Sequence, residues 1–255
     1  MHMTFGIGNV LGTGFRVWLR NLIPFLLITG LFHAPPWLWA LSAVHGSDGT
    51  SESLLHAAQV VQWASYLNLP LGVFVTATLT YGVVMELHGQ RASIGACIAT
   101  GFARFLPALG VGILTCLCVG VASIALVIPG IIVLCMLYVS TPVSVVERPG
   151  MMASLNRSSE LTKGHRWEIF CIVFLLALLA FAVAFVTGMF SATLLRPREL
   201  TLESLPALLS KHVYFTYAHQ VMTGSLTAVI SAVVYVFLRA EKDGTSTAEL
   251  AAIFD

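Results

Sequence analysis

The fold is decided by residues 105–146, which read FLPALGVGILTCLCVGVASIALVIPGIIVLCMLYVSTPVSVV and contain no charged side chain. A helix needs about 20 residues to cross roughly 30 Å of bilayer hydrocarbon, so this run is long enough for two spans. Pro129 and Gly130 lie near its middle, where proline removes a backbone donor and glycine permits a reversal. The run therefore predicts a transmembrane helical hairpin that is interrupted near these two residues.

Four further uncharged runs are each about as long as one span, and they cover residues 21–43, 63–85, 169–191 and 213–238. Apolar residues make up 57% of the chain and charged residues 10%. Soluble globular domains usually hold about 45–50% and about 25% of these classes, so a soluble fold could not bury this much apolar surface. The sequence predicts an all-α membrane protein, a single domain over residues 1–255 with six transmembrane helices.

The charges are distributed unevenly about these spans, although the net charge is only +1. A near-neutral chain offers no broad basic face, so nucleic acid is not expected as a partner. In a six-span arrangement three cations fall on one side, namely Arg196, Arg198 and Lys211. Ten fall on the other side: Arg16, Arg20, Arg91, Arg104, Arg148, Arg157, Lys163, Arg166, Arg239 and Lys242. The positive-inside rule then predicts that both termini are cytoplasmic.

An internal repeat is indicated by two matching segments. Residues 7–15 contain Ile-Gly followed by Thr-Gly-Phe, and residues 94–102 contain the same letters at the same spacing. Each segment, and a weaker third one near residues 153–169, has apolar residues at helical spacing and is expected to be a cytoplasmic amphipathic helix. We therefore expect three hairpin repeats, each preceded by such a helix, in units of about 1–88, 89–148 and 149–240. Chance similarity between small apolar residues remains an alternative to duplication.

The remaining segments are expected to be short. Residues 43–62 and the segment after residue 195 each combine turn residues with apolar residues at helical spacing, which indicates a turn followed by a separate interfacial helix. Neither is large enough for a folded external domain. Residues 239–255 are expected to form a short cytoplasmic tail.

Three motifs in the chain resemble those of a bacterial membrane family described as YciC-like, which is similar to the membrane domain of some glycerophosphoryl diester phosphodiesterases. They are Ile128-Pro129-Gly130-Ile131, the stretch from Ser154 to Trp167, and the stretch from Tyr235 to Gly244. The resemblance covers nearly the whole chain and implies a bundle of about six helices in the bacterial inner membrane. It carries no phosphodiesterase activity to this chain, which lacks that soluble domain.

The same central motif predicts a membrane-surface site. Gly164 can end a helix, Lys163 and Arg166 can meet anionic headgroups, and Trp167 suits the interface. Docking of a cytoplasmic protein is the alternative. The full set of expected lipid or interface residues is Arg16, Arg20, Arg104, Arg157, Lys163, Arg166 and Trp167.

Ionisable residues inside a span usually mark function, and this chain has few of them. Glu86 and Glu147 lie at span ends, where we expect both to reach water. His33 and His219 are a candidate polar membrane site, at expected depths of about 18 and about 28 Å from the cytoplasmic ends of their spans. Polar packing is the favoured role for each histidine, and a substrate or metal role is the alternative.

No catalytic residues, metal site or cofactor are predicted, because no motif for them is found. The leading hypothesis is a non-enzymatic protein that binds lipids or membrane proteins in membrane organisation or homeostasis. A pore or transporter for an apolar or amphipathic solute is the second hypothesis, and an intramembrane enzyme the third. Membrane lipids are the expected partners, and homo-oligomers or complexes with other membrane proteins stay open.

Overall fold

The computed structural model describes residues 5–90, 93–194 and 204–244, and every regular element in those residues is a helix. Six helices, taking α5 and α6 together as one span, are long and apolar enough to cross a membrane, which confirms the predicted class. Arg91, Arg196, Arg198 and the end of the predicted tail, residues 245–255, lie outside the described residues. The helices are α1 (Ile7–Arg20), α2 (Leu22–His45), α3 (Ser51–Leu87), α4 (Ile94–Ala125), α5 (Val127–Leu137), α6 (Ser140–Val146), α7 (Met151–Leu161), α8 (Arg166–Leu194) and α9 (Leu205–Asp243).

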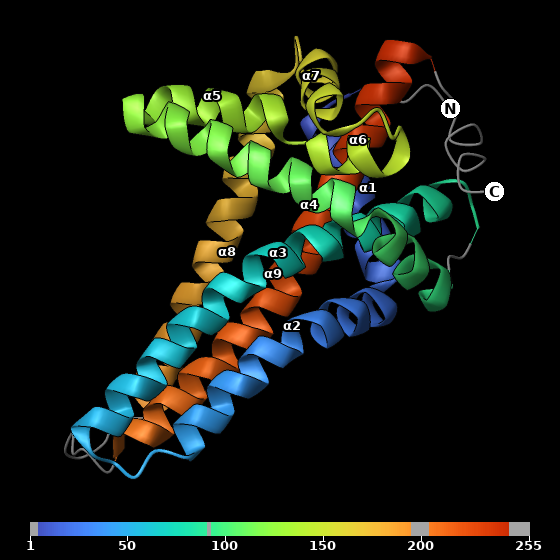
Figure 1. The fold of residues 1–255 in the computed structure, drawn as a ribbon. Helices are drawn as coiled ribbons and strands as arrows, with labels where there is room; N and C mark the ends of the chain where they lie inside the picture. The colour runs from blue at the N-terminus through green and yellow to red at the C-terminus, as the bar shows by residue number, and fades with distance from the viewer. Residues whose placement is uncertain (1–4, 91–92, 195–203, 245–255) are drawn as a thin grey trace.

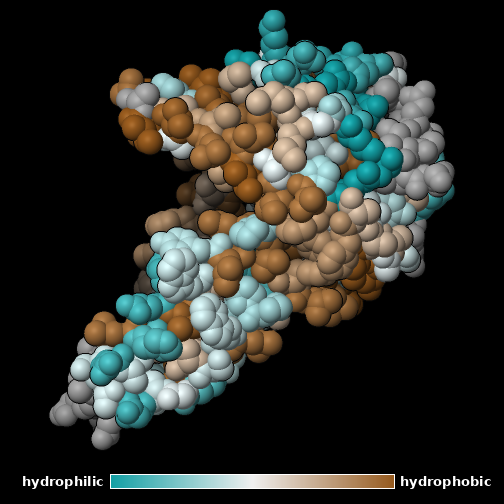
Figure 2. Space-filling model, in the orientation of Figure 1, coloured by the Kyte–Doolittle hydropathy of each residue, from teal (hydrophilic) through white to brown (hydrophobic). Residues whose placement is uncertain are grey.

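Helices α2, α3 and α9 form a long bundle (Figure 1). We call the end that carries the α2–α3 turn, residues 46–50, the distal end. The opposite end, where α6, α7 and the last turns of α9 meet, is the charged end. At 1.5 Å per residue α3 is about 55 Å long and α9 about 58 Å, so both exceed the roughly 30 Å of hydrocarbon. Figure 2 shows hydrophilic surface at the charged end and also at the distal tip.

Both expected separate interfacial helices are wrong, because the segment after residue 195 is already part of α9 from Leu205 on, and residues 51–62 are the first turns of α3. Thr50 starts this helix: its hydroxyl oxygen accepts a hydrogen bond from the Ser53 backbone N–H at 3.3 Å. Ala57 and Val60 are then buried in the bundle. Burial of that face lets α3 continue without a break from the distal tip into the apolar run.

The hairpin predicted from residues 105–146 is present as α4 and α5, which project sideways from the long bundle (Figure 1). The chain reverses at Leu126, whose backbone is extended, and Pro129 lies in the first turn of α5. A Cβ atom on Gly130 would lie 2.1 Å from Ser123 Oγ and 3.1 Å from Ser123 Cα, so only glycine fits the close approach of the two helices. The second half of this span is divided at Val139 into α5 and α6.

Helix α1 packs along α9, a neighbour that the sequence did not predict. The Phe5 backbone N–H donates to Glu241 Oε2 at 2.9 Å, and Trp18 Nε1 donates to Ser225 Oγ at 3.0 Å. These contacts run in opposite chain directions, so α1 packs antiparallel along the charged-end half of α9. Because α1 occupies that length, α2 begins near Ser225 rather than at the end of α9.

The helices that precede the later hairpins differ from one another. The segment expected as a second separate amphipathic helix is continuous with the span, since residues 94–125 form the single helix α4. Helix α7 is separate from α8, and Gly164 with φ 97° lies in the turn between them, which confirms that this glycine ends a helix. The main core lies at the charged end, where α1, α6 and α8 surround the buried residues of α9.

Candidate functional site

A buried polar cluster joins α2, α3 and α9 inside the bundle. His33 Nδ1 lies 2.7 Å from Asn68 Oδ1, and the two residues are 2% and 3% exposed. The amide nitrogen of Asn68 donates to the Ala64 carbonyl at 2.7 Å, so the amide oxygen must face the histidine. Hydrogen-bond complementarity therefore assigns the proton to His33 Nδ1, which donates to Asn68.

Two further side chains extend this cluster to α9. Trp37 Nε1 donates to Gln220 Oε1 at 3.0 Å, which fixes the orientation of the Gln220 amide. The amide nitrogen of Gln220 then lies 3.3 Å from His33 Nδ1. Because Nδ1 gives its proton to Asn68, this approach brings two donors close together and is not a hydrogen bond. Polar groups in lipid-facing bundles are costly unless they find partners, and the His33–Asn68 and Trp37–Gln220 pairs each supply one. The arrangement favours the packing role for His33.

His219 makes a different contact. Its Nε2 donates to the Ala180 carbonyl of α8 at 3.1 Å, so His33 faces α3 and His219 faces α8. The expected difference in depth is wrong, because His33 contacts Gln220, the residue next to His219. The expected depths assumed that α2 and α9 reach the same level at the cytoplasmic side. In the structure α1 occupies the charged-end half of α9, so α2 begins near Ser225 instead.

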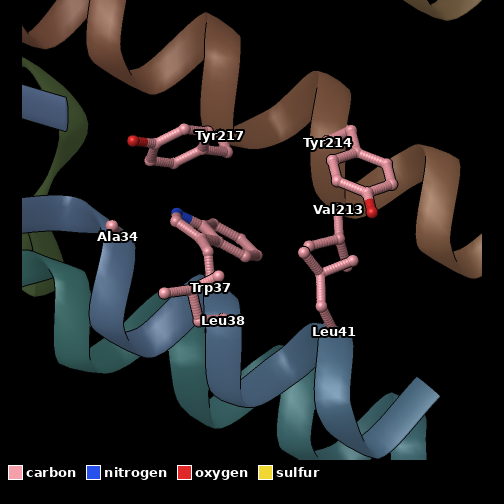
Figure 3. A pocket seen from close by; sticks show the side chains of 7 residues that line it. All are labelled: Ala34, Trp37, Leu38, Leu41, Val213, Tyr214 and Tyr217. Atoms are coloured by element: carbon pink, nitrogen blue, oxygen red, sulfur yellow. The ribbon is translucent and has the colours of Figure 1, made fainter. Parts of the chain in front are cut away.

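An apolar groove runs along the contact between α2 and α9. Its distal part is a pocket of about 150 Å³ in which the rings of Trp37 and Tyr217 face each other and Leu41 and Tyr214 stand toward the distal end (Figure 3). A second pocket of about 470 Å³ continues from Tyr217 toward the charged end and reaches Leu26 and Met222. We call the two together the α2–α9 groove. Another apolar pocket, of about 510 Å³, lies on the α3 side of α2 and is lined by Phe32, Pro35, Pro36, Trp39, Leu67, Pro70, Leu71 and Phe105.

Side chains of opposite charge interlock at the charged end. Arg157 Nε donates to Glu147 Oε2 at 3.0 Å, and the Arg157 guanidinium also binds the Asp243 carboxylate. Tyr235 Oη donates to Glu147 Oε1 at 3.1 Å and accepts from Arg239 Nη1 at 2.7 Å. Burial alone would lower the pKa of Arg157, but the Glu147 and Asp243 carboxylates outweigh it and raise that pKa above its ordinary value. We call these five residues the charged-end network.

The expectation that Glu86 and Glu147 reach water freely is wrong. The Glu86 side chain is 6% exposed and its carboxylate lies 3.0 Å from Arg20 Nε. The Glu147 side chain is 15% exposed within the charged-end network. Their positions at span ends predicted that both carboxylates would be exposed to solvent. In the structure α1 covers Glu86 and α7 covers Glu147.

The seven expected lipid residues fall into three groups. Arg20 and Arg157 form the ion pairs described above. Arg16, Lys163 and Trp167 are exposed, and Trp167 reaches 73%. Arg104 and Arg166 are partly buried, and each has a buried Nε without a hydrogen-bond partner among the described residues. The chain brings Lys163, Arg166 and Trp167 together at the α7–α8 junction, whereas Arg16 lies on α1 and Arg104 on α4.

Sequence reasoning missed Asn68 and Gln220 because it searched the spans for ionisable groups alone. Asn68 is the single amide side chain in residues 63–85 and Gln220 the single one in residues 213–238. A lone amide in an apolar run is a signal that could have found both. In the part of the chain that the structure describes, no three His, Cys, Asp or Glu residues gather as a metal site.

Comparison of the chain with protein-family models, curated proteins and solved structures found no match, so the YciC-like resemblance stays a prediction.

Proposed function

We propose that this protein binds anionic lipids of the bacterial inner membrane at its charged end and acts in membrane organisation or homeostasis without catalysis. The observation that carries the proposal is the surface at the start of α8. Trp167 stacks on Phe170 with ring centroids 5.2 Å apart, and Phe170 stacks on Phe174 at 6.0 Å. Phe174 is 55% exposed, so this aromatic row continues the open apolar surface of α8 up to an exposed tryptophan.

The basic residues of the motif stand where this apolar surface begins. Tryptophan favours the boundary between hydrocarbon and headgroups, so Trp167 sets the headgroup level on α8. Lys163 and Arg166 precede it in the turn and first residue of α8 and therefore belong to the same level. A Lys or Arg near an anionic surface contributes about 1 kcal/mol of attraction. Arg104 is an additional candidate, while Arg20 and Arg157 act in ion pairs within the protein. Arg16 lies two residues before Trp18, whose bond to Ser225 places it along α9 away from the level of Trp167.

In this proposal the charged end faces the cytoplasm, with both termini on that side, as the distribution of cations predicts. We also propose that the chain arose from three hairpin repeats. The two matching glycines, Gly14 and Gly101, support this origin, because both are buried at contacts between helices.

The bundle offers less support to a pore. The space between α2, α3 and α9 is filled at the distal end by Trp37, Ala40, Val60, Ala64 and Val213. Farther toward the charged end the buried cluster of His33, Asn68 and Gln220 occupies the same interior. Solute would have to displace both sets of packed side chains.

The proposal is tested with purified protein in detergent and a fluorescent phosphatidylglycerol, with binding followed by fluorescence anisotropy. We expect unlabelled phosphatidylglycerol to compete better than phosphatidylcholine, and salt to weaken binding. The double variant Lys163→Gln/Arg166→Gln should lose about 2 kcal/mol, or roughly thirtyfold in affinity, because two charges are removed.

The matched control is Lys163→Arg/Arg166→Lys, which preserves both charges and should bind nearly as well as the wild type. Wild-type affinity in the double glutamine variant, or binding that ignores both salt and headgroup charge, would refute the proposal.

A further inference from the structure

We infer that the α2–α9 groove is a second lipid site, which holds an acyl chain of one anionic phospholipid from the distal leaflet with its headgroup at Lys211. This inference does not rest on the proposed function, because it uses different residues at the opposite end of the molecule.

Tyr217 and Trp37 present ring faces to the groove, because their polar atoms are already bonded within the bundle. Tyr217 Oη donates to the Gly30 carbonyl at 3.0 Å, and Trp37 Nε1 donates to Gln220 at 3.0 Å. Both rings are therefore held in fixed positions on either side of the distal pocket (Figure 3). A flexible apolar chain fits such a surface, whereas a polar solute would lose its hydration without gaining partners.

The groove has the length of a lipid chain. The two pockets, which meet at Tyr217, together extend on α2 from Leu26 to Leu41, which is about 22 Å at 1.5 Å per residue. Between them the Tyr217 side chain crosses from α9 to the Gly30 carbonyl of α2, so an acyl chain must pass over its ring. One leaflet contributes about half of the roughly 30 Å of hydrocarbon, so an acyl chain that starts at the distal end lies wholly within the groove. A helix of a second copy is about 10–12 Å wide and is too thick for the pocket of about 150 Å³ between Trp37 and Tyr217.

A lysine lies at the distal mouth of the groove. Lys211 is exposed and lies one helical turn before Tyr214, on the face of α9 that continues through Ala218 to Met222. His45, also exposed, lies one turn after Leu41 at the end of α2. In an anionic phospholipid the negative phosphate lies directly next to the acyl chains. A cation at the mouth of an apolar groove can therefore bind the phosphate while the groove holds a chain.

Aromatic side chains place this mouth at the level of headgroups. Trp39, Trp63, Tyr66 and Tyr214 are each 45% or more exposed, and they come from α2, α3 and α9 around the same distal part of the bundle. Exposed tryptophan and tyrosine gather at membrane interfaces. Because Lys211 lies just distal to Tyr214, its ammonium group reaches the phosphate level and the groove below lies in hydrocarbon.

The experiment is native mass spectrometry of the delipidated full-length protein after titration with phosphatidylglycerol or phosphatidylcholine. Ala34→Phe and Ala218→Phe each fill the groove from one of its two helices, and either should reduce binding of one lipid molecule at least tenfold. Lys211→Gln should remove the preference for phosphatidylglycerol while phosphatidylcholine still binds. Ala177→Phe adds the same bulk to an exposed position of α8 and should leave binding unchanged.

Unchanged lipid adducts in both groove-filling variants, at wild-type thermal stability in detergent, would overturn the inference. A dimer that becomes monomeric in those variants would identify a second copy as the occupant and would overturn it equally. Loss of adducts only in Lys163→Gln/Arg166→Gln would support the charged-end proposal and refute the groove. The two proposals can thus fail separately.

Discussion

Tyr235 donates a hydrogen bond to Glu147 across 3.1 Å and thereby joins α9 to the end of α6. Tyr235 is fully buried, and Glu147 in turn binds Arg157 from α7. Two of the three motifs that carry the family resemblance, residues 154–167 and 235–244, are therefore interlocked through a glutamate that belongs to neither. The charged and tyrosine residues of these two motifs are therefore explained by contacts within the protein as well as by lipid binding.

Removal of the Tyr235 hydroxyl should destabilise the fold. In Tyr235→Phe the Glu147 carboxylate keeps Arg157 but loses a donor in a mostly buried position, which costs about 1–3 kcal/mol of the free energy of unfolding. The measurement is denaturant unfolding in detergent. Tyr66→Phe is the control, because Tyr66 is 53% exposed and its hydroxyl is not part of the network. Equal stability of the two variants would show that the network adds nothing.

The His33–Asn68 pair should show a measurable but modest coupling. Hydrogen bonds between transmembrane helices contribute about 0.6 kcal/mol on average and up to about 1.7 kcal/mol. A double-mutant cycle of His33→Ala and Asn68→Ala should therefore give a coupling free energy in this range, measured by unfolding in mixed micelles. The same cycle between His33→Ala and His219→Ala should give a value near zero, since the two histidines face different helices. A large coupling in the second cycle would contradict the separate packing roles.

Gly101 should tolerate no larger residue. A Cβ atom there would lie 2.0 Å from Thr78 Oγ1 and 3.1 Å from Thr78 Cβ, so α3 and α4 would have to move apart. We expect Gly101→Ala to lower the free energy of unfolding by about 1–3 kcal/mol. Gly120→Ala on the same helix has nothing within 4 Å of the new atom and should be neutral or slightly stabilising. If both variants were equally stable, the close helix contact would be disproved.

The sequence by itself determined the class of this protein. Long uncharged runs can only be stable in hydrocarbon as helices whose backbone groups bond internally, so residues 105–146 and the four other runs predict the six apolar helices found. Local chemistry was also readable: Pro129 and Gly130 predicted the interruption between α4 and α5, and Gly164 predicted the end of a helix.

Only the tertiary structure decided what lies beside what. The sequence predicted an amphipathic helix near the start of the chain but not its neighbour, and packing of Trp18 against Ser225 lays α1 along α9 and shifts the level of α2. That shift brings His33 to Gln220, which no count along the chain predicted. Periodicity reveals which face of a helix is apolar, but it carries no information on which neighbour covers that face. The partners of Glu86, Asn68 and Glu147 depend on contacts between helices far apart in the chain, and for this reason the sequence could not provide them.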